Sequence, residues 1–214
     1  QTADAAFSTS TNWTPERTTP ANSDILVFNN GGTYNVTGVT TQTIGQLSVS
    51  NVTKVTLQST AAATLSIAGG DGTDLIVEAG SELNISNGYA IVIALPTGAT
   101  GSISGSMAFS APGTTTIPHK LTAIDASSII FNSGSTFTAG LYMKDNVFGT
   151  TAFNSIVFTS GSTYVHIAGS NPFGASQPNS VVVFQTGSLY WLKSANSTPA
   201  FSGRTYADFQ FEYS

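Results

Sequence analysis

Short runs in which apolar and polar residues alternate recur along the whole chain. Leu65 and Ile67 alternate with polar neighbours, and Leu83 and Ile85 do the same in a later run. A two-residue period predicts β-strands with one buried face and one wet face. The runs are bounded by Gly, Ser, Asn and Asp, which is typical of turns between strands. No window keeps a 3.6-residue apolar period, so we expect little helix.

Many of these strands belong to a repeat. Three stretches near the C-terminal end share an Asn-Ser or Ser start, an apolar strand, a Gly-Ser pair and an aromatic residue. They are residues 128–137, 154–164 and 179–190. Their aligned phenylalanines, Phe131, Phe158 and Phe184, are evenly spaced along the sequence. A fixed period of this kind, in the range of roughly 20–50 residues, indicates a repeat architecture.

Earlier copies extend the repeat toward the N-terminus. Residues 22–34 form a fourth copy, and residues 74–83 form a fifth with Val77 in place of the phenylalanine. We expect Leu47–Val49 and Gly105–Ser106 to be degenerate copies that fill the gaps. A second motif, Asn-x-Phe-Gly in its clearest form, runs in step with the first at residues 146–149, 171–174 and, more loosely, 201–203.

A unit of about 25 residues holds two or three strands and cannot bury its apolar face alone, so neighbouring units must stack. We predict an all-β fold, a single-stranded parallel β-helix (β-solenoid) of about 25–27 residues per coil. An antiparallel β-sandwich is the competing all-β fold, but it gives no reason for a repeat of this length. Two sets of residues should then stack from coil to coil. They are the aromatics Phe28, Phe131, Phe158 and Phe184, and the positive-φ corner glycines Gly31, Gly80, Gly134, Gly161 and Gly187.

The two ends of the chain differ from the middle. Residues 1–21, which include Asn12–Pro15 and Pro20, precede the first repeat and are predicted to be an N-terminal capping segment, with an ordinary loop as the alternative. Residues 22–214 form the β-helix repeats. Because residues 209–214 occupy a strand position with no cap after it, we expect the repeats to continue in a longer protein.

Composition points to an extracellular protein. Only 8% of the residues are charged, and Ser and Thr are abundant, which suits hydroxyl-rich faces of a secreted chain. The net charge of −5 without a basic patch argues against nucleic-acid binding. Cysteine is absent, so stacking and sheet hydrogen bonds must supply the stability. No apolar run is long enough for a membrane-spanning helix, so membrane insertion is not expected, and Gln1 is interpreted as following signal-peptide removal.

These motifs in combination resemble a known group. Asn12–Pro15 before a Val-Phe strand, the repeated Asn-Ser-(Ile/Val)-Val-Phe unit, and Phe201–Phe209 are similar to β-solenoid repeat regions of large secreted surface proteins of Bacteroidetes-type bacteria. Many such proteins are cargo of type IX secretion, although the sorting domain is not present in this chain. The resemblance implies a secreted or cell-surface location and supplies no catalytic residues.

Residues that could carry chemistry are few. His119 and His166 lie far apart in the sequence, there is no Cys and no H-x-x-x-H spacing, so a transition-metal site is not expected. His166 on its strand is interpreted as a surface residue. No G-x-S-x-G motif is present to place a nucleophilic serine. These observations favour a non-enzymatic protein.

Polysaccharide lyases and hydrolases on β-helix scaffolds are the enzymatic alternative. Such hydrolases need carboxylates at a defined separation. Asp71 and Asp74 are the closest acidic pair in the middle of the chain, and Lys144–Asp145 is the closest mixed pair. Asp145 has no acidic counterpart at the matching place in the next repeat, so a site spanning two coils is not favoured.

One segment suggests calcium. Gly69–Val77 matches the G-G-x-G-x-D-x-U-x nonapeptide of calcium-binding β-rolls, which makes Asp71 and Asp74 candidate ligands. Those sites form between consecutive copies, however, and this chain has one copy. A turn before the strand at 75–77 is the alternative, and calcium is the one cofactor that the sequence indicates.

Two features could bind a ligand. A column of aromatics at the end of the repeat could stack on sugar rings, or could pack at a corner of the solenoid. Its members are Tyr34, Phe137, Tyr164 and Tyr190. Threonine pairs such as Thr136 and Thr138 suggest an ice-binding face, but the pairs do not recur once per coil.

The sequence therefore predicts a non-enzymatic, secreted or cell-surface β-solenoid that acts as a stalk, scaffold or adhesive segment of a larger bacterial protein. Its expected partner is an extracellular glycan or another surface or secretion-system protein. The alternative is a glycan-binding module or a polysaccharide-degrading enzyme on the same scaffold.

Overall fold

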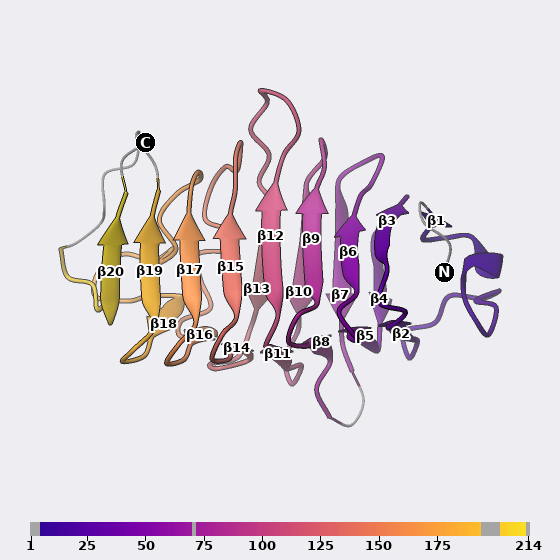
Figure 1. Ribbon diagram of the computed structural model, residues 1–214, viewed down its shortest axis with the longest axis horizontal. Helices are drawn as coiled ribbons and strands as arrows, with labels where there is room; N and C mark the ends of the chain where they lie inside the picture. The colour runs from indigo at the N-terminus through magenta and orange to yellow at the C-terminus, as the bar shows by residue number, and fades with distance from the viewer. Residues whose placement is uncertain (1–4, 70–71, 194–201, 213–214) are drawn as a thin grey trace.

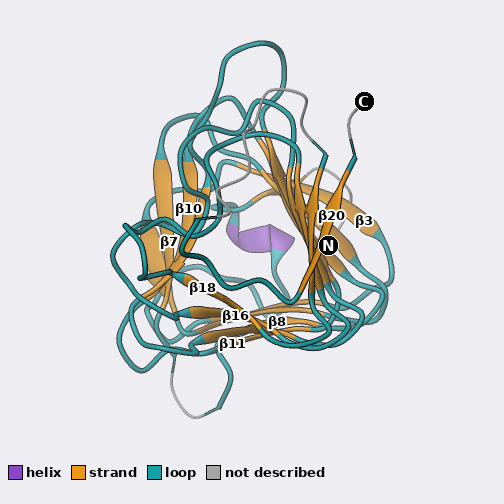
Figure 2. Ribbon diagram, turned by 90° about the vertical axis from the view of Figure 1, so that its left-hand side faces the viewer, coloured by secondary structure: helices purple, strands orange, loops and turns teal. Residues whose placement is uncertain are grey.

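The chain forms an elongated parallel β-solenoid. A computed structural model describes residues 5–69, 72–193 and 202–212. Figure 1 shows the strands in chain order along the long axis, and the view along that axis in Figure 2 shows three sheets around a common interior. All paired strands are parallel, as the repeat predicts.

The three sheets are named here A, B and C. Sheet A contains β1 (Ala5–Ala6), β3 (Thr33–Thr37), β6 (Lys54–Leu57), β9 (Glu82–Ser86), β12 (Ser106–Ser110), β15 (Thr136–Ala139), β17 (Thr163–His166), β19 (Leu189–Leu192) and β20 (Asp208–Phe211). Sheet B contains β2 (Ile25–Phe28), β5 (Gln46–Val49), β8 (Leu75–Val77), β11 (Gly101–Ile103), β14 (Ile129–Phe131), β16 (Ile156–Phe158) and β18 (Val182–Phe184). Sheet C contains β4 (Gln42–Ile44), β7 (Ala63–Ile67), β10 (Ile91–Leu95) and β13 (Lys120–Ala123).

Within the described residues, the seven strands of sheet B mark seven successive coils and fix the register. One stacked position runs through all of them: Phe28, Val49, Val77, Ile103, Phe131, Phe158 and Phe184. The predicted degenerate copies are therefore confirmed, with Ile103 in the strand just before Gly105. The predicted range of coil lengths, about 25–27 residues, is too narrow. The first coil, from Phe28 to Val49, is shorter than predicted because its turns are shorter, and two later coils are slightly longer.

The interior is filled by the inward side chains of every strand. In the C-terminal half these form a column of stacked rings, with Phe131 and Phe158 centroids 4.4 Å apart at an interplanar angle of 3° and Phe158 and Phe184 5.2 Å apart. Phe148 and Phe173 from the second motif are also buried beside this column. The predicted aromatic stacking is confirmed for these coils.

The Gly-Ser pairs turn the chain from sheet B into sheet A. All five predicted corner glycines have φ between 71° and 83°, which a residue without a Cβ adopts at low cost. A buried serine follows four of them, whereas Gly32 follows Gly31. In three coils the serine hydroxyl donates to the carbonyl three residues earlier: Ser135 to Asn132, Ser162 to Thr159 and Ser188 to Gln185. The pair thus supplies both the backbone turn and its internal hydrogen bond.

The N-terminal segment covers the end of the solenoid. Strand β1 pairs with β3, and the 3-10 helix η1 (Ser10–Asn12) follows. Phe7 is buried, and the Trp13 ring contacts Phe7 and Phe28 edge-on at 5.7 and 5.5 Å. Figure 2 shows η1 projected over the middle of the interior. We call this segment the cap.

Sheet C is shorter than the others. After β13 the third side is built from turns that contain the second motif, where the Asn146 side chain donates to the Asn171 carbonyl at 2.6 Å. Leu121 of β13 donates its N–H to the carbonyl of Val147 in the next coil. In the part of the chain that the structure describes, no helix has the length and apolar character needed to cross a bilayer.

Candidate functional site

The predicted sugar-binding column lies inside the solenoid. Tyr34 is 8% exposed, and Phe137, Tyr164 and Tyr190 are at most 1% exposed. Tyr164 packs edge-on against Tyr190, with ring centroids 5.4 Å apart. A ring at this depth offers no face to a sugar, so the binding hypothesis for these four residues is wrong. They pack as a corner column of the core instead.

His166 is also buried, at 2% exposure, which contradicts its interpretation as a surface residue. The Tyr190 hydroxyl lies 2.8 Å from His166 Nδ1, and the Gly169 carbonyl lies 3.2 Å from Nε2. Burial lowers the pKa of His166. Tyr164 is buried as well, and residues two apart on a strand share a face, so both side chains lie on the inner face of β17 (Thr163–His166).

His119 is fully buried in another coil. Its Nδ1 accepts the N–H of Ile91 at 3.1 Å, and its Nε2 lies 3.1 Å from the Asn87 carbonyl. An imidazole that accepts at one nitrogen and donates at the other is neutral. Burial lowers the pKa of His119, against the opposing effect of its backbone hydrogen bonds. Each histidine therefore acts as a hydrogen-bonding spacer in the core.

Several carboxylates connect one coil to the next. Asp125 accepts the N–H of Gly98 at 2.6 Å, and Asp74 accepts the N–H of Thr100 at 2.6 Å. Glu82 on β9 lies 2.6 Å from Lys54 on β6, and the hydrogen bond from Lys54 lowers the pKa of Glu82. These acids are spaced along the solenoid, and each carboxylate is bonded to a group in a neighbouring coil.

The candidate calcium segment gives a partial picture. Asp71 lies outside the described residues. Asp74 is buried, and a Cβ added to Gly69 would lie 1.2 Å from its Oδ1, so the loop closes tightly on this side chain. Among the described residues no group of three His, Cys, Asp or Glu side chains forms a metal cluster. The contact of Asp74 with Thr100 accounts for its position, and calcium binding remains a prediction.

The mixed pair Lys144–Asp145 lies in a turn of the shortened third side. Asp145 has a positive φ of 61°, and its backbone carbonyl accepts the N–H of Ser170 in the following coil at 2.9 Å. The backbone of this residue therefore has a defined structural role.

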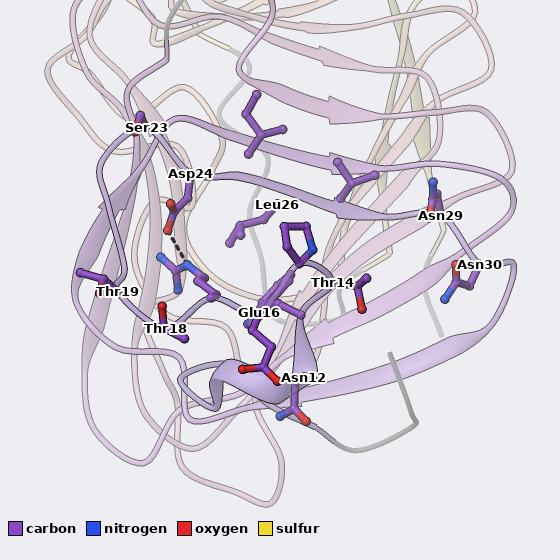
Figure 3. Close-up of a pocket in the computed structure, with 15 residues that line it drawn as sticks. Asn12, Thr14, Glu16, Thr18, Thr19, Ser23, Asp24, Leu26, Asn29 and Asn30 are labelled. Atoms are coloured by element: carbon purple, nitrogen blue, oxygen red, sulfur yellow. Dashed lines mark hydrogen bonds and ion pairs between the residues drawn. The ribbon is translucent and has the colours of Figure 1, made fainter.

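A hollow lies between the cap and β2 (Figure 3). It has a volume of about 660 Å³ and is lined by Asn12–Thr19, Ser23–Val27, Asn29 and Asn30. We call it the cap groove. Sequence reasoning missed it, because it exists only where residues 12–19 fold back over the first coil.

An ion pair fixes the shape of the cap groove. Arg17 Nε lies 2.5 Å from Asp24 Oδ2, and an Arg17 amino group donates to Gln42 Oε1 at 2.8 Å. Burial raises the pKa of Asp24, but hydrogen bonds from Ala21 N–H and Arg17, together with the Arg17 charge, bring it below its usual value. Arg17 is 9% exposed and also lies over the Phe7 ring. The cap is thus tied to the start of β2.

A second hollow of about 670 Å³ lies on the outer face of sheet C. Its lining includes the small side chains of Ser66, Ala94 and Thr122, together with Lys120 and the turn at 149–152. The outward column of Thr43, Ser66, Ala94 and Thr122 lies in direct register. Three of the four residues in this column carry a hydroxyl group.

Comparison with known proteins gives no family for the chain: no family model matches it, and neither a curated protein nor a solved structure does so.

Proposed function

We propose that this chain is a non-enzymatic, secreted or cell-surface β-solenoid that serves as a stalk, scaffold or adhesive segment of a larger bacterial protein. The observation that carries the proposal is the use of its ionic groups. Lys54 with Glu82, Asp74 with Thr100, and Asp125 with Gly98 each join neighbouring coils. Charged side chains that are bonded to the neighbouring coil stabilise the stacking of coils, which is what an elongated structural segment requires.

The outward residues of the sheets support the same role. On sheet A, Thr136 and Thr138 stand beside Ser106 and Ala108 of the preceding strand, β12. On sheet C, the hydroxyl-bearing residues Thr43, Ser66 and Thr122 lie in one outward column. A surface of this kind stays hydrated at low charge, which suits an extracellular stalk. The resemblance to secreted surface proteins favours the same location.

A glycan-binding or glycan-cleaving role on the same scaffold is the second candidate. The cap groove favours it, because Asn29 and Asn30 at one end and Glu16 at the side offer amide and carboxylate groups in a hollow of the right order for a sugar. The expected partner is then an extracellular glycan. If the chain is a stalk or scaffold, the expected partner is a surface or secretion-system protein instead.

A glycan array combined with a reducing-end release assay separates the candidates. A structural segment should release no reducing ends from any polysaccharide, and an adhesive one should bind glycans without cleaving them. Release of reducing ends would overturn the proposal. An Asn29→Ala, Asn30→Ala variant tests whether binding uses the cap groove, with Thr136→Ala on sheet A as the matched control.

A further inference from the structure

The first strand of sheet B has an outer edge that no other strand covers in the described part of the chain. β2 is the terminal strand of this sheet, followed by β5 and β8 on one side. The cap adds its strand β1 to β3 of sheet A instead. In the first coil, β1 therefore covers the outer edge of sheet A, whereas the outer edge of sheet B at β2 has no described strand beside it.

The backbone of β2 shows which groups face that edge. The carbonyls of Asp24 and Phe28 accept the N–H groups of Gln46 and Ser50, on the β5 side. Backbone groups of successive residues in a strand point to opposite edges, so those of Ile25 and Val27 point away from β5. Unpaired strand edges are templates for pairing with another chain.

The cap groove runs along this edge. Ile25 and Val27 line it, and their side chains are 64% and 45% exposed. Figure 3 shows Asp24 at one end of the strand, Asn29 and Asn30 beyond the other, and Glu16 on the side of the cap. The ion pair of Arg17 with Asp24 ties the cap to the start of β2 at one end of this slot.

The charge of the cap groove determines which kind of side chain is favoured in it. Arg17 neutralises Asp24, whereas Glu16 is an exposed carboxylate for which no ion pair is found among the described residues. The groove thus carries one net negative charge in a chain whose net charge is −5. A cationic side chain is favoured in this slot, and an acidic one is disfavoured.

We propose that the cap groove binds an extended peptide that carries a Lys or Arg and adds an edge strand to sheet B beside β2. Main-chain hydrogen bonds to Ile25 and Val27 supply the affinity, and Glu16 supplies the preference for a basic residue. At roughly 3.3 Å per residue, the strand from Ile25 to Asn29 accommodates about five residues. This inference holds whether the chain is a stalk or a glycan-active module.

The experiment uses the full chain and short capped peptides of alternating valine and threonine with one central lysine. Hydrogen exchange of the Ile25 and Val27 amides should slow by about tenfold or more when the lysine peptide is saturating. The same peptide with glutamate in place of lysine should bind more weakly. A lysine peptide with N-methylated alternate amides, which cannot pair on one edge, should not bind.

Variants locate the site. Val27→Pro removes an N–H that faces the groove and leaves the β5 side of the strand intact, so it should weaken peptide binding by about tenfold or more. Thr136→Ala on sheet A, away from the groove, is the control and should bind as the parent chain does. Glu16→Gln should remove the preference for lysine over glutamate.

Three results would overturn the proposal. One is equal binding of the lysine peptide and its N-methylated form, and another is exchange at Ile25 and Val27 that stays unchanged at saturation. The third is a dimer in solution that the proline variant dissociates, because it would assign the edge to a second copy of the chain. If the proline variant does not fold, the N-methylated peptide and the exchange rates decide the question.

Discussion

Gly105 shows how one residue is fixed by the approach of two coils. Register places Ile103 opposite Val77 and Ser106 opposite Glu82, so this corner has two residues between its strands where the preceding coil has four. A Cβ on Gly105 would lie 2.2 Å from the Ser81 carbonyl oxygen and 2.3 Å from that of Glu78. Only a residue without a side chain fits this shortened turn.

Replacing Gly105 with alanine should therefore lower the free energy of unfolding by about 1–3 kcal/mol, since backbone atoms must move to admit the methyl group. Gly88→Ala is the control, because its Cβ would meet no atom within 4 Å and its φ is not positive. That change should be neutral or stabilise by up to about 1 kcal/mol. Urea denaturation of both variants tests this, and equal losses would contradict the steric explanation.

The buried histidines make stability depend on pH. Burial lowers the pKa of His119 and His166 below 6.5 in the folded chain. As the pH falls through 6.5, the unfolded chain binds protons before the folded chain does. The free energy of unfolding should thus be highest above this pH and decrease as the pH falls below it.

His119→Gln should reduce this pH dependence and leave the contribution of His166. Glutamine keeps a donor and an acceptor for Asn87 and Ile91 but cannot titrate in this range. Chemical denaturation at several pH values, for the parent chain and the variant, measures the two slopes. Identical slopes would show that His119 does not carry the effect.

At the scale of elements, the aromatic column links strands that are far apart in sequence. Phe158 on β16 stacks on Phe131 of β14 and Phe184 of β18, with all three side chains at most 5% exposed. Parallel strands in register bring like residues together, and offset rings add to the free energy of burial. Because the phenylalanine recurs at the same place in each of these repeats, the same ring-on-ring contact recurs from coil to coil.

Phe158→Ala should cost about 3–5 kcal/mol, because it leaves a cavity between two rings that the flanking coils cannot close. Phe153→Ala is the matched control, since that ring is 46% exposed, and it should change the free energy of unfolding by no more than about 0.5 kcal/mol. Thermal and urea denaturation compare the two. A small effect at Phe158 would mean that the column rearranges freely.

The strands also show why some predictions were right and others wrong. Each apolar strand with a Gly-Ser corner was found, because period-two patterning and a positive-φ glycine are local properties. The exposure of Tyr34, Tyr164 and Tyr190 was misjudged, because an amphipathic aromatic ring near the start of a strand can face either way until the neighbouring sheet is placed.

At the scale of the whole molecule, stability spreads from coil to coil, since each coil contacts mainly its neighbours. The cap closes one end: Trp13 covers Phe28, and its Nε1 donates to the Phe7 carbonyl at 3.0 Å. Without this ring the first coil would expose the end of the aromatic and aliphatic interior to water.

Trp13→Ala should therefore loosen the N-terminal coils selectively. Amide hydrogen exchange in β2 and β3 should accelerate markedly, whereas exchange in β16 and β17 should change little. Hydrogen exchange measured by mass spectrometry resolves these segments. Uniform acceleration along the chain would show instead that the solenoid unfolds as one cooperative unit.

The sequence by itself determined the all-β repeat, the stacked positions and the corners, because these follow from a period that each coil repeats locally. It could not determine the depth of His119 and His166 or the shape of the cap groove. Those depend on which sheet lies opposite and on how residues 12–19 cross the first coil. The stacking of coils follows from the sequence repeat. The cap groove lies where the repeat begins, and only the tertiary structure places the cap against the edge of β2.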